Sequence, residues 1–482
     1  MINGKVVAFI LGILLLIEGA FMMLIVPVSL YYHDSDTIYI FLSAFLTLLS
    51  GFLLWAIFRN RNKSVGKREG YLLVTLAWVV FSFYGALPYF TSGAMTSFVN
   101  AFFEAVSGFT TTGATVSVNV ESLSHGLLLW RSLTQWIGGM AVIILALVVL
   151  PQLGIGGIQL FAAEVTGPLT ERLHPRIKET VKRLLVVYVL ITLAQVVLLR
   201  LGGMNVYDAV CHSFSTISTG GFSTKQDNIA HYTSPFIHYV FIIFMMVAGL
   251  NFTLTYFAFH LRFKQIWRNE EFKAYLSFFI IFVPVLTAIL IFFQHGAIER
   301  SFRLALFEVA SIVTTTGFTV VNYLNWIPAA WILLLLLMFL GGCYGSASGG
   351  VKVIRVLVLL KQGFLELKRL IHPNAIIPAR IEQEAVKPEL ITSVLAFITV
   401  YVLVIVSGIL IIAFLGYDLE TSMGAVIASV GNIGPAIGKV GPGTNYAFFS
   451  EPAKLILSGL MIVGRLELFT VLILFTPAFW KK

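Results

Sequence analysis

Long apolar stretches separated by short polar segments dominate the sequence. A stretch long enough to cross a bilayer, about 20 residues, can be placed at ten positions. These stretches lie at roughly 6–30, 37–58, 71–90, 126–150, 184–203, 235–261, 274–294, 328–360, 389–415 and 453–480. The pattern predicts an all-α, polytopic membrane protein. The first stretch is too long for the core of a signal peptide, and we expect it to be retained as a helix.

Between the later long stretches lie shorter apolar pieces, in connections too apolar to be ordinary loops. These pieces are SFVNAFFEAVSGF (97–109), VYDAVCHSFSTI (206–217), LALFEVASIV (304–313) and MGAVIASV (423–430). They are too short to cross a bilayer and suit re-entrant half-helices. Irregular backbone at membrane depth is tolerated only where protein buries it or where it lines a wet cavity. We therefore expect the four pieces to surround such a cavity.

Each short piece ends in a polar motif with a glycine. The motifs are TTTG (110–113), ISTG (217–220), TTTG (314–317) and NIG (432–434). Their glycines recur with a period near 100 residues, and the order helix, half-helix, glycine turn, helix repeats with them, which indicates an internal repeat. One such motif alone is typical of small-residue helix packing, whereas four in register favour a pore.

The expected architecture is four pseudo-symmetric helix–half-helix–filter–helix repeats around one pore, preceded by an extra transmembrane hairpin. The boundaries that follow are 1–68 for the hairpin and 69–165, 166–270, 271–385 and 386–482 for the repeats. In such a pore, glycine lets successive backbone carbonyls face inward and replace the water around a cation. Threonine favours extended backbone and adds a hydroxyl. The half-helix presents its negative C-terminal end to the cation.

Composition agrees with membrane insertion and excludes several functions. The chain is 58% hydrophobic and 11% charged, whereas soluble proteins contain about 25% charged residues. Cys211 and Cys343 are the only cysteines, so no disulfide framework or thiolate metal site is expected. The histidines lack metal-ligand spacing. No catalytic grouping supports an enzyme, and no organic cofactor is expected on this chain.

The basic residues gather in a few segments, which predicts the topology. Most of the 32 Lys and Arg residues fall at Lys5, 59–68, 172–183, 262–273, 352–387 and 481–482. Basic loops stay in the cytoplasm by the positive-inside rule, and these follow every second long stretch. Both termini are therefore expected on the cytoplasmic side of the inner membrane. Topology and lipid contacts account for the net charge of +9 without nucleic acid.

With these motifs identified, the chain resembles the Trk/Ktr/HKT superfamily of potassium transporters, and within it the TrkH-type uptake subunits. The resemblance covers residues from about 69 to the end, and the leading hairpin (1–58) matches TrkH-type members. It implies that potassium binds in a filter, because all four glycines are present, whereas relatives with serine at the first position admit sodium. The residues implied are Thr110, Thr111, Thr112, Gly113, Ile217, Ser218, Thr219, Gly220, Thr314, Thr315, Thr316, Gly317, Gly431, Asn432, Ile433 and Gly434. The second and fourth motifs diverge from TTTG, which implies a less discriminating filter.

The eighth stretch contains GGCYGSASGG, which is too rich in Gly and Ser to hold a helix. This segment is either a gate or a passive kink in the helix. The resemblance implies a gate below the filter. The implied gate residues are Gly341, Gly342, Cys343, Tyr344, Gly345, Ser346, Ala347, Ser348, Gly349, Gly350 and Arg465. Arg465 lies in the last apolar run, where an arginine at mid-membrane costs roughly 2.5–3.5 kcal/mol. It is expected either to face the pore as a barrier to cations or to pair with an acid from another helix. Glu467 is the nearest acid but is expected to be a poor partner, because residues two apart on a helix do not face each other.

The resemblance also implies partners and roles for the inner loops. A homodimer is expected, together with a cytosolic nucleotide-binding regulatory ring (TrkA-type) docked on basic loops such as 262–273 and 352–387. Three acids in the half-helices, Glu104, Asp208 and Glu308, either attract cations or pair and cap locally.

Three transport mechanisms remain open from the sequence. The first is potassium uptake through a gated pore. The second is an alternating-access symporter coupled to sodium or protons, although carrier repeats are commonly inverted and every repeat here starts on the inside. The third is sodium-coupled uptake by a Ktr-like subunit, against which the extra hairpin and Arg465 argue.

Overall fold

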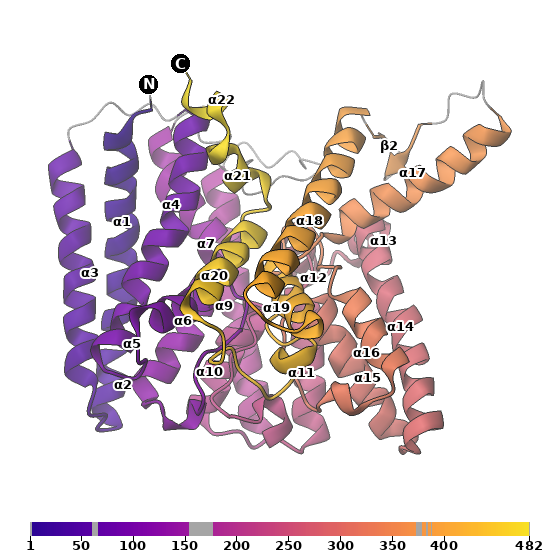
Figure 1. Ribbon diagram of the computed structural model, residues 1–482, viewed down its shortest axis with the longest axis horizontal. Coiled ribbons are helices and arrows are strands. Elements are labelled where there is room, and N and C mark those ends of the chain that lie inside the picture. The colour runs from indigo at the N-terminus through magenta and orange to yellow at the C-terminus, as the bar shows by residue number, and fades with distance from the viewer. Residues whose placement is uncertain are drawn as a thin grey trace.

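The computed structural model describes residues 2–59, 66–153, 177–372, 378–381, 384–386 and 388–481. Within these ranges the fold is a bundle of helices, with one pair of short antiparallel strands, β1 (Arg380–Ile381) and β2 (Glu384–Ala385). Figure 1 shows both chain ends at the same end of the bundle. The predicted all-α class is confirmed.

The N-terminal hairpin packs through small residues. It consists of α1 (Gly4–Met23), α2 (Val26–Tyr31) and α3 (Thr37–Phe58). A Cβ on Gly12 of α1 would overlap the carbonyl oxygen of Gly51 on α3, and a Cβ on Gly51 would overlap that of Gly12. This close approach of backbones is typical of membrane helix pairs. Large apolar side chains on α3, such as Phe45 and Phe52, remain exposed, as expected for a lipid-facing helix.

The four repeats follow the hairpin in chain order. The first contains α4 (Lys67–Gly85), α5 (Leu87–Thr91), α6 (Phe98–Phe109), η1 (Val120–Ser122) and α7 (His125–Leu153). The second contains α9 (Ile177–Leu201), α10 (Val206–Ile217), η3 (Asn228–His231), α11 (Pro235–Ala248), α12 (Phe252–Phe259) and α13 (Phe263–Arg268). The third contains α14 (Glu270–Gln294), α15 (Ile298–Val313), η4 (Tyr323–Asn325), α16 (Pro328–Leu337) and α17 (Val353–Ile371). The fourth contains α18 (Pro388–Phe414), α19 (Leu419–Gly431), η5 (Gly438–Val440), α20 (Glu451–Arg465), α21 (Phe469–Leu472), η6 (Ile473–Phe475) and α22 (Pro477–Trp480). The boundary expected between residues 165 and 166 lies outside the described residues.

All four predicted half-helices are present as α6, α10, α15 and α19, although α15 and α19 begin earlier in the chain than expected. Polar side chains cap three of them at the N-terminus. The Ser97 hydroxyl, the Asn205 amide oxygen and an Asp418 carboxylate oxygen each accept a hydrogen bond from a backbone N–H of the first turn. Such caps satisfy orphan donors, which helps a short helix to form at membrane depth.

The ten predicted stretches are only partly continuous helices. Among the described residues, six helices are long and apolar enough to cross a membrane, or up to eight if each of two bent pairs counts as one span. The stretch 235–261 bends by 114° between α11 and α12, and 453–480 bends by 111° after α20. An unbroken helix through 453–480 was the wrong expectation. The interruption expected within 328–360 is present between α16 and α17.

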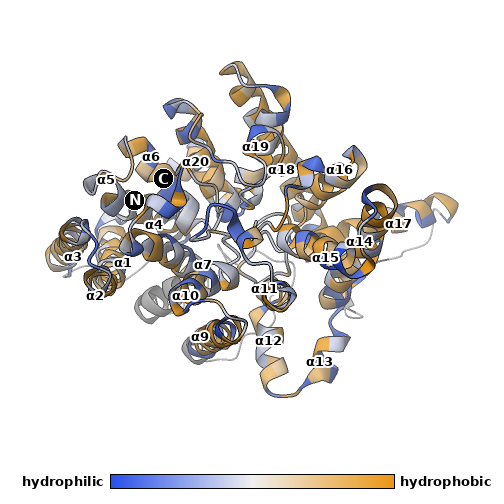
Figure 2. Ribbon diagram, turned by 90° about the horizontal axis from the view of Figure 1, so that it is seen from below, coloured by the Kyte–Doolittle hydropathy of each residue, from blue (hydrophilic) through white to orange (hydrophobic). Residues whose placement is uncertain are grey.

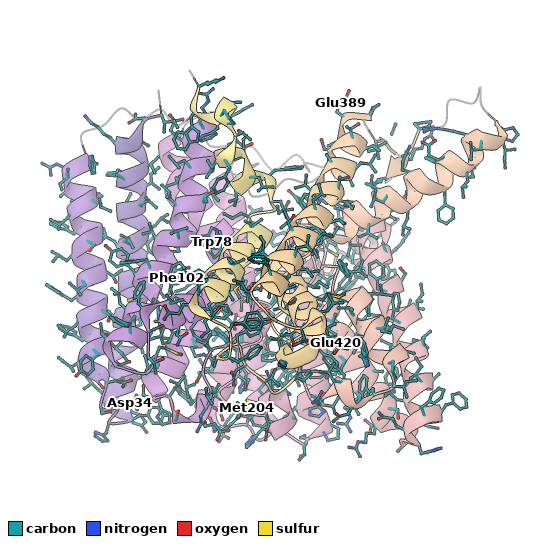
Figure 3. The ribbon with its side chains drawn as sticks, in the orientation of Figure 1. Asp34, Trp78, Phe102, Met204, Glu389 and Glu420 are labelled. Carbon is teal, nitrogen blue, oxygen red and sulfur yellow. The ribbon has the colours of Figure 1, made fainter. Side chains whose placement is uncertain are left out.

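The chain is a multi-pass membrane protein, and its two ends along the bundle are easy to locate. Asp34, in the turn before α3, lies at the end opposite to Glu389 at the start of α18 (Figure 3). Seen along the bundle, apolar residues dominate the outer helices, and irregular segments meet near the middle (Figure 2). The half-helices surround this central region.

Candidate functional site

The backbone takes the same path after each half-helix. Four left-handed residues follow the helix ends, namely Thr111 (φ 53°), Thr219 (φ 55°), Thr315 (φ 56°) and Asn432 (φ 53°). Two residues later comes a glycine with positive φ, namely Gly113 (82°), Gly221 (78°), Gly317 (77°) and Gly434 (90°). Glycine adopts this region without steric cost. We refer to the four segments 110–113, 218–221, 314–317 and 431–434 as the glycine turns.

In the second repeat this pattern corrects the sequence-based alignment by one residue. Gly221, and not Gly220, has the positive φ that matches Gly113. Ile217, expected in the turn, is the last residue of α10, and Ser218 takes the position of Thr110. The two adjacent glycines gave the sequence no means of choosing between them.

The glycine turns form a closed ring in the order of the chain. A Cβ on Gly113 would overlap the carbonyl oxygen of Gly220, and one on Gly221 would overlap that of Thr316. The contact continues from Gly317 to the carbonyl oxygen of Ile433. The ring closes where a Cβ on Gly434 would crowd the carbonyl oxygen of Thr112. Each turn therefore meets the next, and no turn tolerates a side chain at its last residue.

The turns are buried apart from the half-buried Gly113, and side chains outside them hold them in place. The Asn432 amide donates to the Thr112 hydroxyl at 2.9 Å and to the Met461 carbonyl oxygen at 3.0 Å, which links the fourth repeat to the first. Gln135 of α7 donates to the carbonyl oxygen of Gly220 at 2.6 Å and accepts from the Phe222 N–H at 3.1 Å. The second turn is therefore held by an amide, and Gln135 carried no recognisable signal in the sequence.

A cavity opens on one side of the ring, with walls from all four repeats. Its lining includes Ala114 and Thr115 after the first turn, Ser223 after the second, Thr319 after the third and Pro435 after the fourth. Because the positive-φ glycines Gly113, Gly221 and Gly434 also line it, this cavity is the mouth of the ring.

Residues 341–350, which we call the central loop, fill the break between α16 and α17 and lie against the ring. The Gly349 N–H donates to the Thr315 hydroxyl at 2.7 Å, and a Cβ on Gly349 would overlap the carbonyl oxygen of Gly431. The Cys343 N–H donates to the Gly249 carbonyl oxygen at 2.8 Å, at the bend between α11 and α12. The loop is thus attached to turns of the third and fourth repeats and to the bent helix of the second.

The rest of the central loop is held by charged groups. The Tyr344 N–H donates to the Glu271 carboxylate of α14 at 2.6 Å. The buried Lys352 ammonium donates to the carbonyl oxygen of Ser348. These contacts give the loop a defined conformation, which a tract so rich in Gly and Ser would not adopt by itself.

Arg465 contacts the central loop directly. Its guanidinium donates to the Ala347 carbonyl oxygen at 2.5 Å and to the Gly138 carbonyl oxygen of α7 at 3.0 Å. Arg465 is the last residue of α20, so the expectation that Arg465 and Glu467 lie on one continuous helix was wrong. Glu467, in the bend beyond it, has a positive φ of 56° and forms an ion pair with Arg355 of α17 at 2.5 Å.

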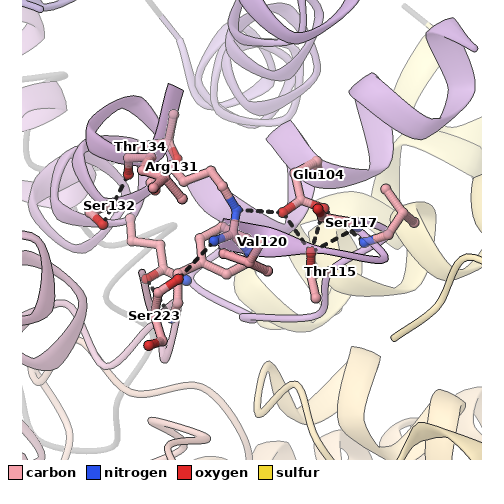
Figure 4. A network of polar contacts seen from close by, with 12 residues as sticks. Glu104, Thr115, Ser117, Val120, Arg131, Ser132, Thr134 and Ser223 are labelled. Carbon is pink, nitrogen blue, oxygen red and sulfur yellow. Dashed lines mark hydrogen bonds and ion pairs between the residues drawn. The ribbon is translucent and has the colours of Figure 1, made fainter. Parts of the chain in front are cut away.

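Glu104 and Asp208, two of the three half-helix acids, form local contacts of the kind that the pairing interpretation expected. Glu104 forms a buried ion pair with Arg131 at 2.7 Å and accepts from Thr115 and the Val116 N–H (Figure 4). Asp208 accepts from the Thr224 hydroxyl at 2.6 Å.

Comparison with known proteins identifies the family. The model of the family described as TrkH, cation transport protein, matches residues 37–299 and 293–482. The chain belongs to the TrkH family. The Trk system potassium uptake protein TrkH of Salmonella typhimurium is 39% identical over 482 residues, covering 99% of each chain. The Trk system potassium uptake protein TrkG of Escherichia coli is 34% identical over 490 residues, covering 99% of each chain. The crystal structure of the potassium transporter TrkH from Vibrio parahaemolyticus matches with a TM-score of 0.90 and 36% identity, covering 100% of both chains.

The TrkH family is a family of transport proteins, in agreement with the expectation that the chain is not an enzyme. The structural match extends over the leading hairpin as well as the four repeats. The glycine turns, the central loop and Arg465 therefore lie at the centre of a TrkH-family fold.

Proposed function

We propose that this protein takes up potassium across the cytoplasmic membrane through a single pore on the axis of the four repeats. The observation that carries the proposal is the closed ring of four glycine turns. Two relatives that match this chain over 99% of its length are named potassium uptake proteins. Their names support potassium as the transported ion. The basic connections favour a topology with both termini in the cytoplasm, and this topology is part of the proposal.

The glycine turns are the proposed selectivity filter. Backbone carbonyls and threonine hydroxyls at a constriction replace the hydration shell of a potassium ion. The residues proposed are 110–113, 218–221, 314–317 and 431–434. Because Asn432, Ile433 and Ser218 replace threonines and Gln135 holds Gly220, we expect weaker discrimination than in a filter with four equal turns.

The central loop and Arg465 are the proposed gate. The loop lies against the third and fourth glycine turns through Gly349, and Arg465 holds it at Ala347. A fixed positive charge in a wall of low dielectric raises the barrier to cations. Opening requires the loop to leave these contacts, which an altered position of α17 would produce.

Two assembly partners belong to the proposal. A homodimer and a cytosolic nucleotide-binding ring are proposed from the resemblance stated above, and the exposed basic residues Lys264 and Arg268 of α13 suit an acidic protein surface. The described part of the chain contributes helices for conduction, and nucleotide regulation would come from the partner.

The experiment measures rubidium and sodium uptake into proteoliposomes, with sodium and proton gradients varied separately. Rubidium uptake that follows only its own gradient supports a gated pore. Uptake that requires an inward sodium or proton gradient would support a symporter instead. Deletion within 343–348 should raise rubidium flux without changing the ratio of rubidium to sodium uptake, and a folded deletion variant with lower flux would refute the gate.

A further inference from the structure

A recurring position in the half-helices contacts the strand beyond each glycine turn. Nine residues before the positive-φ glycine stand Glu104, His212, Glu308 and, in the fourth repeat, Ala425. All four are buried. Asp208, which the sequence grouped with Glu104 and Glu308, does not occupy this position, because Gly221 sets the register.

The first and third repeats use a carboxylate in the same way. Glu104 accepts a hydrogen bond from the Val116 N–H at 2.8 Å, and Glu308 accepts one from the Val320 N–H at 3.1 Å. Both N–H groups lie three residues beyond the glycine. The side chain therefore ties the end of the glycine turn to the half-helix that begins it.

The second repeat uses an imidazole. His212 Nε2 lies 2.9 Å from the Ser223 hydroxyl oxygen, two residues beyond Gly221. His212 Nδ1 lies 2.8 Å from the Asp208 carbonyl oxygen, one turn earlier in α10. With Nδ1–H donating to that carbonyl, Nε2 is the acceptor for the Ser223 hydroxyl.

In the fourth repeat, the side chain of Ala425 is too short for this contact. The backbone of α19 instead lies directly against the strand beyond the glycine turn. A Cβ on Gly424 would overlap the carbonyl oxygen of Ile437, which is three residues beyond Gly434. Small residues at 424 and 425 therefore let α19 pack directly on the strand that the other repeats reach with a side chain.

The two carboxylates differ in charge compensation. Glu104 faces the Arg131 guanidinium at 2.7 Å, with both side chains buried. Arg131 continues to the Ser223 carbonyl oxygen at 3.1 Å, so it also joins the first repeat to the second. Glu308 has no cation within ion-pair distance among the described residues, and its Oε2 lacks a hydrogen-bond partner there. A buried carboxyl without a cation is favoured in its neutral form.

We propose that Glu104, His212 and Glu308 are positioning residues that set the ion selectivity of the glycine turns. The inference rests on the proposed function of these turns as the filter. Carbonyl positions must be held closely for a ring to distinguish two cations. Each of the three side chains limits the movement of the strand that leaves its turn.

The test is the ratio of rubidium to sodium uptake by purified variants in proteoliposomes. Glu308→Ala and His212→Ala should lower this ratio several-fold. Glu308→Gln should keep most of it, because the amide oxygen still accepts from Val320 and no cation loses its partner. Glu104→Gln should lower it, because Arg131 is then a buried charge without a counter-ion. Ser107→Ala is the matched control, since this buried hydroxyl of α6 has no hydrogen-bond partner among the described residues.

The contrast between Glu104→Gln and Glu308→Gln keeps the test decisive if the alanine variants do not fold. Equal ratios for the wild type, Glu308→Ala and Glu104→Gln in folded protein would overturn the positioning role. If Gly221→Ser also leaves the ratio unchanged, the filter assignment itself fails. A lower ratio for Gly221→Ser alone leaves the filter intact and removes only the positioning residues.

Discussion

The backbone N–H of Gly349 donates a 2.7 Å hydrogen bond to the hydroxyl of Thr315. This bond connects the central loop to the third glycine turn, so the proposed gate and the proposed filter share a contact. Losing an acceptor at a buried donor costs about 1–3 kcal/mol, which is enough to shift a balance between two loop positions roughly five-fold or more.

Thr315→Val should therefore raise rubidium flux, because the loop loses its attachment while the side chain keeps its shape. Thr111→Val is the matched comparison, since the Thr111 hydroxyl has no hydrogen-bond partner among the described residues. Thr315→Ser should retain low flux. Tracer uptake into proteoliposomes measures all three variants, and equal effects of the two valine variants would contradict a gating contact at Thr315.

Gly221→Ser should loosen discrimination between rubidium and sodium. Its φ of 78° is strained for a residue with a side chain, and a Cβ would overlap the Thr316 carbonyl oxygen. Gly113→Ser should act in the same direction through the Gly220 carbonyl oxygen. Gly459→Ser on α20, where a Cβ meets nothing within 4 Å, is the control. An unchanged uptake ratio in folded Gly221→Ser protein would refute the assignment of the second turn.

Asp418, which caps α19, should contribute a pH-dependent stability. Hydrogen bonds from the Thr421 backbone and hydroxyl lower the pKa of the exposed Asp418 carboxyl below its ordinary value. An acid with a lowered pKa stabilises the fold above its unfolded-state pKa of about 3.9 and loses this contribution as the pH falls through its folded-state pKa.

The Asp418→Asn variant separates the charge from the cap, because asparagine caps helices about as well as aspartate. The wild type should lose more thermal stability than Asp418→Asn between pH 6 and about pH 3. Asp418→Ala should be less stable than both at pH 6, by about 1 kcal/mol. Parallel melting curves for the wild type and Asp418→Asn over this range would contradict the role of the charge.

Charge reversal at Lys264 and Arg268 should weaken binding of a cytosolic ring protein. Both side chains are exposed on the short α13, so their replacement by glutamate removes no buried contact. Co-purification should fall and should become less sensitive to salt, while flux through the isolated subunit stays the same. Binding that neither the double variant nor salt affects would leave these residues as topology signals only.

Hydropathy predicted the fold to the level of repeats because spans and half-helices differ in length. It could not predict the bends, because α12 and the segment after α20 are themselves apolar and continue the apolar runs of the helices before them. Glu467 and Leu468 take positive φ in the second bend, a conformation for which neither residue type gives a signal. The ion pair between Glu467 and Arg355 depends on that bend, so it could not be derived from spacing along one helix.

Within the site, the period of the motifs identified three of the four glycines that have a positive φ. The fourth, Gly221, was missed because Gly220 directly precedes it and fits the same motif. Contacts such as those of Gln135 with the second turn join residues 85 and 87 positions apart and leave no local pattern. The same holds for His212, whose role depends on a register that only the backbone angles reveal.

Arg465→Ala should increase rubidium flux in folded protein. The guanidinium bonds two carbonyl oxygens, one on the central loop at Ala347 and one on α7 at Gly138. Alanine removes the positive charge and also leaves the loop without this attachment, so both changes favour conduction. The ratio of rubidium to sodium uptake should stay near the wild-type value, because the glycine turns are unchanged.

The variants Arg465→Lys and Arg465→Gln separate the effect of the positive charge on flux from the effect of the hydrogen bond to the central loop. Lysine keeps the charge, whereas its single ammonium lacks the planar fork that reaches two carbonyls at once, so most of the block should remain. Glutamine keeps a donor and loses the charge. If charge dominates, flux should rise in the order wild type, lysine, glutamine, alanine, with the largest step between lysine and glutamine. A folded alanine variant with unchanged or lower flux would mean that Arg465 supports the structure and forms no barrier.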